Sequence, residues 1–525
     1  MRIFRELHKS GDDPFRRQQR ENPSPTKDEG DLFSHRPSPR KIRVLLDDEH
    51  LPEDTSLTAQ LFAALVRHWR VFSLTVEAST ITSTDYSPPA QPGLLRVCDS
   101  TAAAGDFSYR GPQYSWSRDD EDAHPDGSST LAAHGSTHPQ NQICETVRSY
   151  RHLAQQHRTD YRLKDTITQT ILAEVARDAG FDLLVSEAPA AACRLLPIHD
   201  RAVVVSRTEA VPILAHYLRR QHIFVVGPRC AVHHSRHNYY EQSVHSLAPA
   251  LRGWQGRAMV PGAAPEIAAD VQSRCSTALS RLARALESRD DIIWSLGSYL
   301  TTPVLEDCMD DFDHLLLLLC GGVDVIARAL HLALGLPPKD VRFAKLHAPW
   351  YTENVRKRYS TNPLEADNLA ELDCLQTNLK VIFELRNSIH NVQIRPVLAF
   401  VTSPESGARN EAPFLAHVTA DIATKIENLG PGVSREWGFQ STYGGGAAAD
   451  LWRVADKAVE TTFRFLDLLS LIVLRNPLPA SESAVLSGEV PALPPRETLW
   501  EGYDDHLPVL LGLPAPHVVG GSVTT

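Results

Sequence analysis

One helix-forming segment carries an arginine, an asparagine and a histidine close to its end. Arg386, Asn387 and His390 occur in the stretch ELRNSIHN, where the arginine and the histidine are four residues apart. Side chains with this spacing lie on one face of a helix. An arginine fork can hold a phosphate, and a histidine can move a proton to or from a ribose 2′-hydroxyl near neutral pH. The pattern therefore predicts RNA cleavage that needs no metal ion.

A structural interpretation of the same residues stays open. Arg386 and Asn387 can hydrogen-bond a neighbouring helix end, and His390 can interact favourably with the C-terminal dipole of its own helix. The helix that positions them is predicted by apolar residues at helical spacing over Leu369–His390. Most of that helix must pack into a core.

A second set of chemically capable residues lies beside the apolar runs of the first half. Four carboxylates are candidates for one rim of a sheet: Asp47, Asp182, Glu187 and Glu209. In an open parallel sheet, ligands bind outside the carboxyl ends of the strands. Carboxylates gathered there would bind Mg²⁺ or Mn²⁺, which can orient a water for attack on a phosphodiester. The alternative is that these acids cap helices or face water.

The elements that must position these acids are short apolar strands that alternate with helical patterns. The strand patterns are Ile42–Leu46, Val71–Val76, Phe181–Ser186, Ala202–Ser206 and Ile223–Val226. Alternation of this kind predicts a parallel α/β sheet over residues 41–226. Residues 82–140 are rich in Pro, Gly, Ser and acidic residues, so we expect a long mobile loop there.

The second half has a different pattern of predicted secondary structure. Long helical patterns cover residues 266–287, 304–336, 364–390 and 449–474, and Val397–Val401 is the one strand pattern between them. We therefore expect an α/β unit followed by an all-α bundle.

Two resemblances follow from these motifs. The first strand ending in Asp47, the stretch FDLLVSE and the stretch AVVVSRTEAVPILAHYL together resemble a PIN-like nuclease domain. This resemblance implies that Asp47 is the first metal-binding acid, that Glu187 takes the place of an aspartate after the polar Ser186, and that Glu174 is the best match for a helical glutamate.

The segment ELRNSIHN resembles the HEPN superfamily of helical ribonucleases and nucleotide-binding modules, which work as dimers. The resemblance implies that Arg386, Asn387 and His390 are the catalytic residues. Three residues separate the arginine from the histidine, whereas the family usually has four to six. The motif is therefore either a shortened active form or the mark of an inactive relative.

These motifs divide the chain into five segments. We expect a disordered tail over 1–40, a PIN-like domain over 41–228, a linker over 229–264, a HEPN-like domain over 265–480 and a C-terminal extension over 481–525. The His-rich patch around His233 and His237 fits a polar linker better than a zinc site, because its spacing matches no known zinc motif.

Composition limits the class of protein. An apolar fraction of 42% and a charged fraction of 22% are typical of soluble globular proteins. The longest apolar run is far too short to span a membrane, so we expect a cytoplasmic protein with no membrane contact. The net charge of −11 opposes a strongly basic nucleic-acid wrapper, although it leaves room for a local basic patch.

Both resemblances point to RNA as the partner, in a homodimer. We therefore expect a ribonuclease-like protein of the toxin or antiviral-defence kind, acting with a partner protein of a defence system. The rival is a non-catalytic sensor or scaffold that keeps the folds without the chemistry. A third hypothesis is that the α/β half binds a nucleotide and regulates the helical half.

Overall fold

The computed structural model divides the chain into two compact units, formed mainly by residues up to Val232 and by residues from His233 onwards. The described residues are 41–51, 54–76, 94–99, 114–119, 132–137, 163–188, 203–228, 232–233, 235–257, 265–297, 302–362, 365–389, 394–402, 409–442, 445–475 and 506–514. The expected tail over 1–40 lies outside them.

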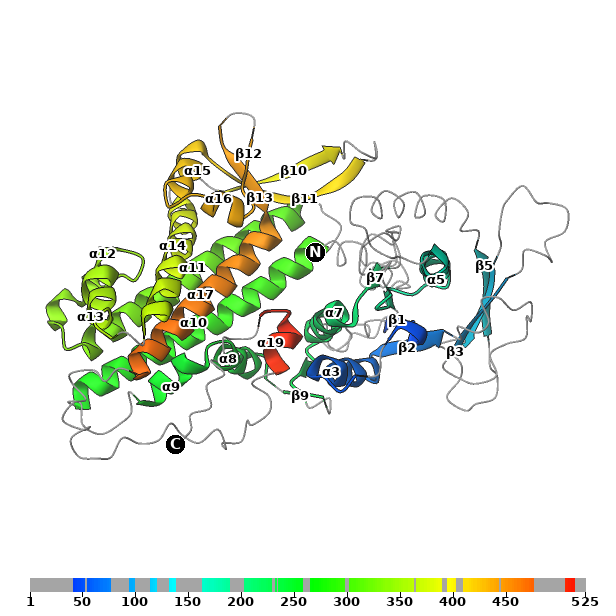
Figure 1. Cartoon of the computed structure of the whole chain (residues 1–525), viewed down its shortest axis with the longest axis horizontal. Helices are drawn as coiled ribbons and strands as arrows, with labels where there is room; N and C mark the ends of the chain where they lie inside the picture. The colour runs from blue at the N-terminus through cyan, green and yellow to red at the C-terminus, as the bar shows by residue number, and fades with distance from the viewer. Residues whose placement is uncertain are drawn as a thin grey trace, which may run out of the picture. The chain divides into compact units, whose positions relative to one another are not determined.

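The first unit is built on a seven-stranded sheet with the strand order β5-β4-β3-β2-β1-β6-β7 (Figure 1). Its strands are β1 (Ile42–Leu46), β2 (Val71–Val76), β3 (Leu94–Asp99), β4 (Tyr114–Asp119), β5 (Ala132–Thr137), β6 (Leu183–Val185) and β7 (Val203–Val205). The five strands from β3 to β7 along this order pair in parallel, and β4 and β5 add antiparallel pairs at one side. The parallel α/β organisation expected for this half is confirmed for the first four expected strands. The expected strand at 223–226 is instead β8 (Phe224–Val225), which forms a separate two-stranded sheet with β9 (Val232–His233).

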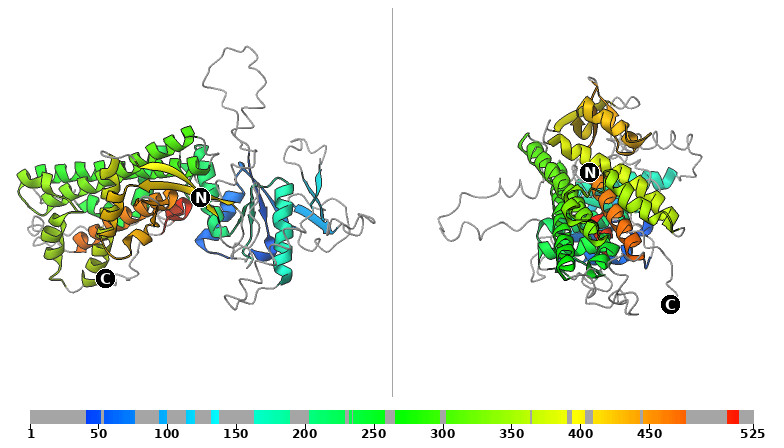
Figure 2. Two further views of the ribbon diagram at one scale, coloured as in Figure 1. Left: turned by 90° about the horizontal axis from the view of Figure 1, so that it is seen from above. Right: turned by 90° about the vertical axis from the view of Figure 1, so that its left-hand side faces the viewer.

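Helices cover both faces of this sheet (Figure 2). They are α3 (Leu57–Val66), α5 (Leu163–Asp178) and α7 (Arg207–Arg220). Because both faces are covered, the central strands are continuously apolar: Val44, Leu45 and Leu184 are fully buried. The apolar face of α5 packs on this sheet, where Ile171 and Val175 share one core with Leu45.

The segment expected to be a long loop differs from the prediction. Three strands, β3 to β5, lie within residues 82–140 and extend the sheet beyond β2. Leu95 and Val97 are fully buried and alternate with the other residues of β3, so they do contribute to a core. Strand β3 forms because it pairs with β2. The local Pro and Gly content of the segment gives no signal of this long-range contact.

The second unit is mostly helical. Its longer helices are α8 (Arg236–Leu247), α9 (Pro249–Arg257), α10 (Pro265–Gly297), α11 (Thr302–Ala333), α14 (Ala366–Ile389), α15 (Ala420–Glu427) and α17 (Leu451–Arg475). The shorter ones are the 3₁₀-helix η5 (Pro338–Phe343), α12 (Pro349–Tyr351), the π-helix η6 (Thr352–Arg356), α13 (Lys357–Tyr359), α16 (Val433–Glu436) and α19 (His506–Leu511). Helix α17 packs against α9, α11 and α14.

A four-stranded antiparallel sheet is part of this second unit. Its strands are β10 (Arg395–Thr402), β11 (Arg409–Val418), β12 (Gln440–Ser441) and β13 (Ala447–Asp450), in the order β10-β11-β13-β12. The sequence predicted only a strand at 397–401. Beside strand β13, a Cβ at Gly446 would lie 2.6 Å from the carbonyl oxygen of Val418, so only glycine fits this close approach.

The expected linker and extension also contain packed helices. Within 229–264, α8 and α9 bury Tyr239, Leu251 and Trp254. In the C-terminal segment, α19 buries Leu507 and Leu510 and packs against α8. The helical unit therefore includes more of the chain than residues 265–480.

Helix α11 is the one helix of the described chain that is long and apolar enough to cross a membrane. Its apolar window over Val304–Ala333 is 78% buried inside the protein. Burial by neighbouring helices is the ordinary environment of an apolar core helix, and we interpret α11 in this way.

Candidate functional sites around Asp47 and Arg386

Asp47 lies at the carboxyl edge of the sheet, directly after β1. Its side chain is 2% exposed, and its backbone N–H donates to the carbonyl of Val185 across the β1–β6 pair. The Ser186 hydroxyl donates to Asp47 Oδ2 at 2.7 Å, and Gln169 Nε2 donates to the same oxygen. His50 Nδ1 lies 3.0 Å from Oδ2. Asp47 is thus the acceptor at the centre of a buried polar cluster.

Local structure explains how this cluster assembles. The short turn η1 (Asp48–His50) follows β1 and turns His50 back toward Asp47. Helix α5 supplies Gln169 from its buried face. Sequence analysis missed His50 and Gln169. A glutamine three and four residues before the apolar Leu172 and Ala173, and so on their helix face, is the signal that could have identified the second of them.

Asp182 is not brought to Asp47. It precedes β6, and its Oδ2 accepts the backbone N–H of Arg43 near the start of β1 at 2.8 Å. Because β1 and β6 run in parallel, Asp182 lies at the amino edge and Asp47 at the carboxyl edge. The prediction that Asp182 lies at the same edge as Asp47 is therefore wrong. Asp182 precedes its strand and Asp47 follows its strand, so two parallel strands place them at opposite edges of the sheet.

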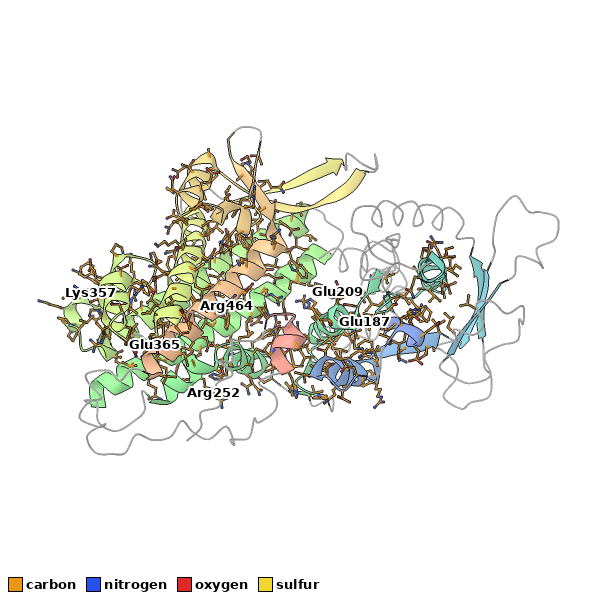
Figure 3. The ribbon with its side chains drawn as sticks, in the orientation of Figure 1. Glu187, Glu209, Arg252, Lys357, Glu365 and Arg464 are labelled. Atoms are coloured by element: carbon orange, nitrogen blue, oxygen red, sulfur yellow. The ribbon has the colours of Figure 1, made fainter. Side chains whose placement is uncertain are left out.

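Glu187 and Glu209 lie at the carboxyl edge but bind backbone groups of helix α7. Glu187 Oε1 accepts the N–H of Arg207 at 2.8 Å. Ser206 and Glu209 form a reciprocal capping box, in which each side chain accepts the other's backbone N–H. Figure 3 labels both carboxylates beside this helix. Glu187 and Glu209 therefore bind the start of helix α7, as the alternative interpretation of these acids expected.

The four predicted ligands do not fit a divalent cation. One lies at the other edge, two cap a helix, and Asp47 accepts hydrogen bonds from an amide and a hydroxyl. Across the described ranges, no group of three His, Cys, Asp or Glu side chains has a metal-binding arrangement. Glu174, the proposed helical glutamate, is buried and forms an ion pair with Arg177 at 2.8 Å.

Arg386 lies in the last turn of α14. It is half-buried, and its Cζ lies 5.3 Å from the ring centre of Phe383, one turn earlier on the same helix. Its Nε atom is buried without a hydrogen-bond partner. Packing therefore fixes the guanidinium while one of its N–H groups stays unused.

The surroundings of Arg386 come from α11 and from the segment after η5. Burial raises the pKa of Cys320 to about 12, and nearby Arg386 acts in the opposite direction. His347 stacks on Phe383 with a ring-centre distance of 3.6 Å. Burial, then Lys345 and Arg386, lower the pKa of His347 to about 4, so this imidazole is neutral at pH 7.

The other two residues of the motif are placed differently. Asn387 is exposed at the end of α14. His390 lies outside the described residues. His347, which sequence analysis missed, is a histidine that the fold brings near Arg386. No short-range motif could have identified it, because the two residues are 39 positions apart along the chain.

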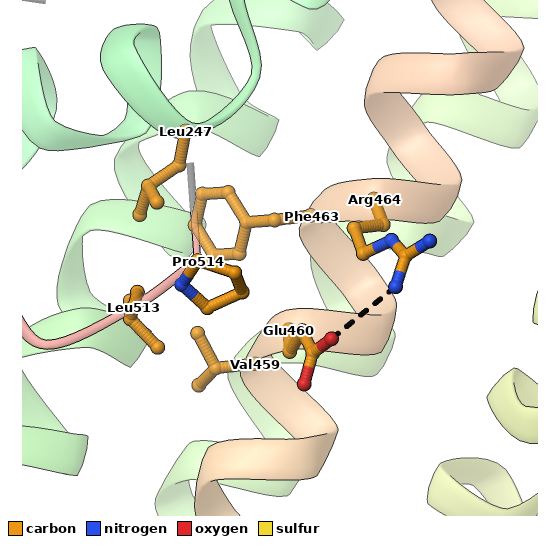
Figure 4. Close-up of a pocket in the computed structure, with 7 residues that line it drawn as sticks. All are labelled: Leu247, Val459, Glu460, Phe463, Arg464, Leu513 and Pro514. Atoms are coloured by element: carbon orange, nitrogen blue, oxygen red, sulfur yellow. Dashed lines mark hydrogen bonds and ion pairs between the residues drawn. The ribbon is translucent and has the colours of Figure 1, made fainter. Parts of the chain in front are cut away.

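A small apolar pocket lies elsewhere in the helical unit (Figure 4). It is lined by Leu247, Val459, Glu460, Phe463, Arg464, Leu513 and Pro514. Arg464 is paired with Glu460 and with Glu371, at 3.3 and 2.8 Å. With its charged groups paired to each other, this pocket offers little chemistry.

Three comparisons with known proteins were made. No protein-family model, no curated protein and no solved structure matches this chain.

Proposed function

We propose that this protein is a ribonuclease-like protein that cleaves RNA through Arg386, Asn387 and His390. The observation that carries the proposal is the environment of Arg386. Its guanidinium is fixed over Phe383 near the end of α14, with a buried Nε that has no partner. A fixed arginine with an unused N–H is suited to hold a phosphate. The likeness of ELRNSIHN to HEPN ribonucleases gives the same assignment.

In this proposal the residues have separate roles. Arg386 stabilises the negative charge that builds up on the phosphate in the transition state. His390 moves a proton at the 2′-hydroxyl or at the leaving oxygen, and Asn387 is the polar residue that accompanies them. Two copies of the α14 end form the composite site in a symmetric homodimer.

In this proposal the first unit is a PIN-like domain. The parallel sheet supports this likeness, and the buried Asp47 lies at the expected edge. Because the predicted ligands of Mg²⁺ or Mn²⁺ do not come together, we assign no metal-dependent step to them. A cytoplasmic location and a toxin or phage-defence role complete the proposal.

Two observations favour a second candidate, a non-catalytic sensor or scaffold. Asp47 accepts hydrogen bonds from Ser186 and Gln169, and half-buried Arg386 lies beside the buried Cys320. Both arrangements are compatible with residues that hold the folds together. In that case the protein would act through a partner protein of a defence system.

RNA cleavage in three buffers separates the candidates. Purified full-length protein is incubated with labelled RNA in Mg²⁺, in Mn²⁺ and in EDTA. Cleavage that persists in EDTA supports the Arg386 site, and cleavage that requires metal assigns the activity to the first unit. Absence of cleavage in all three buffers favours the scaffold.

A further inference from the structure

A group of basic side chains surrounds one carboxyl in the helical unit. We call it the Asp324 cluster, and it consists of Asp324, Arg281, Arg328, Lys345, His347, Lys380 and Arg386. Burial raises the pKa of Asp324, whereas Arg386, Arg328, Lys345 and Arg281 each lower it, so all four lie close enough to act on its charge. The pKa of His347 is likewise lowered by Lys345, Arg386 and Lys380.

Four segments bring these side chains together. Asp324 and Arg328 are four residues apart on α11 and so share a helix face. Helix α10 supplies Arg281, whose Nη1 donates to the Gly321 carbonyl on α11 at 2.9 Å. A Cβ at Gly321 would lie 2.8 Å from that same nitrogen, so glycine makes room for the arginine.

The other side of the cluster is formed by α14 and by the segment between η5 and α12. Helix α14 contributes Lys380 and Arg386, and the short segment contributes Lys345 and His347. Helix α11 packs against both α14 and η5. The stack of His347 on Phe383 fixes the segment to α14.

Several polar atoms of this cluster have no partner. Asp324 Oδ1, Arg328 Nε, His347 Nδ1 and Arg386 Nε are each buried without a hydrogen bond. Buried polar atoms in folded proteins are nearly always hydrogen-bonded. Four such atoms in one cluster therefore indicate a polar binding site.

The sign of the charge identifies the kind of ligand. The whole chain carries −11, yet here four basic side chains of the described chain act on one carboxyl, and a fifth, Lys380, acts on the neighbouring His347. Such a local excess of Arg and Lys is the footprint of phosphate binding. Lys345 is exposed, so the cluster is open to solvent on its side.

We infer that the Asp324 cluster binds the phosphate backbone of single-stranded RNA, and that the Asp324 carboxylate competes with this backbone for Arg386. The inference rests on the proposed function for its choice of RNA. It adds a binding surface of Arg281, Arg328, Lys345 and Lys380 to the arginine of the cleavage motif. It also gives Asp324 a regulatory role, since its charge opposes phosphate binding.

Binding of an RNA that cannot be cleaved tests the inference separately from cleavage. The probe is a short fluorescein-labelled single-stranded RNA with 2′-O-methyl groups, and fluorescence anisotropy is measured over a range of salt concentrations. The double variant Lys345→Ala/Lys380→Ala should weaken binding about tenfold or more and reduce the salt slope by about 1.4, the value for two phosphate contacts on a single strand. The control is Arg274→Ala, which removes a cation of α10 that is paired with Asp270.

Asp324→Asn tests the competition, because it removes the charge at nearly constant shape. It should tighten binding several-fold. Circular dichroism establishes that each variant is folded. No binding by the wild-type protein at low salt, or a folded double variant that binds like Arg274→Ala, would overturn the phosphate site. Unchanged or weaker binding by folded Asp324→Asn would overturn the competition.

The two proposals fail in different ways. If the methylated RNA binds through the cluster but unmodified RNA is not cleaved, the proposed ribonuclease fails and the binding site stands. If unmodified RNA is cleaved but the double variant binds the probe like the wild type, the binding site fails and the ribonuclease stands.

Discussion

At the scale of single residues, Asp47 is the best-defined acid of the first unit. Its position at the carboxyl edge follows from the parallel strands, and the sequence was sufficient to predict it. Its partners Gln169 and His50 could not be predicted, because they depend on how α5 and the turn η1 approach the edge. The position of Asp182 was predicted wrongly for a similar reason, because the edge at which it lies depends on the direction of strand β6.

Ser186→Ala tests the Asp47 cluster. The hydroxyl of Ser186 donates to buried Asp47, so its loss leaves a buried carboxylate oxygen with one donor fewer. We expect the free energy of unfolding to fall by about 1–3 kcal/mol. Urea denaturation measures this change, and Ser360→Ala, on an exposed serine, is the control. Equal stability of both variants would contradict a structural role for the cluster.

Asp467 gives the helical unit a pH-dependent stability. Burial raises its pKa to about 6, while the backbone N–H groups of Ala250 and Leu251 act in the opposite direction. Between about pH 4 and pH 6 the folded state holds this proton more tightly than the unfolded state, so stability falls as pH rises through this window. Asp467→Asn removes the effect.

The measurement compares Asp467→Asn with the wild type at a series of pH values. We expect the wild type to lose about 1–3 kcal/mol relative to the variant between pH 4 and pH 7. The difference in free energy of unfolding between the two proteins cancels the contribution of other titrating groups. One such group is His245, because burial lowers its pKa to about 4. A difference that does not change with pH would show that Asp467 is not buried as described.

At the scale of elements, local patterns were sufficient for the central strands and the longest helices. The predicted strand at 42–46 and the predicted helices at 364–390 and 449–474 lie within two residues of β1, α14 and α17. Each has an uninterrupted apolar pattern. Strands β3 to β5, and strands β11 to β13 of the second sheet, were missed because pairing with distant strands forms them.

The start of α7 offers a direct test of its capping box. Ser206→Ala removes the acceptor for the Glu209 N–H and should lower the free energy of unfolding by about 1 kcal/mol. Ser206→Asp keeps an acceptor at the same place and should retain most of the stability. Thermal unfolding of both variants measures the difference. If the two substitutions cost the same, the capping hydrogen bond contributes nothing.

An ion pair between buried Arg289 and partly exposed Asp456 connects α10 and α17. Arg289 is 3% exposed; its Nε donates to Asp456 at 2.6 Å and its Nη1 to the carbonyl of Leu511 at 3.0 Å. Arg289→Ala removes this pair and the hydrogen bond to Leu511, and we expect the free energy of unfolding to fall by about 1–3 kcal/mol. Urea denaturation checks this loss against Arg284→Ala, an exposed arginine of the same helix. A loss no greater than the control's would mean that the pair is dispensable.

At the scale of the whole molecule, the local distribution of charge differs from the net charge. A net charge of −11 opposes binding of RNA, whereas the Asp324 cluster gathers basic side chains locally. Asp324 and Arg328 within the long apolar helix α11 were a signal in the sequence. Their neighbours Arg281 and Lys345 come from other segments, so the site itself required the fold.

The central claim is that Arg386 cleaves RNA without metal. The most direct measurement is the cleavage rate of labelled RNA in EDTA, for wild type, Arg386→Ala and the control Arg284→Ala. We predict cleavage by the wild type and the control, and a rate at least about a hundredfold lower for folded Arg386→Ala. Wild-type protein that leaves RNA intact in EDTA, or a folded Arg386→Ala that cleaves at the wild-type rate, would contradict the claim.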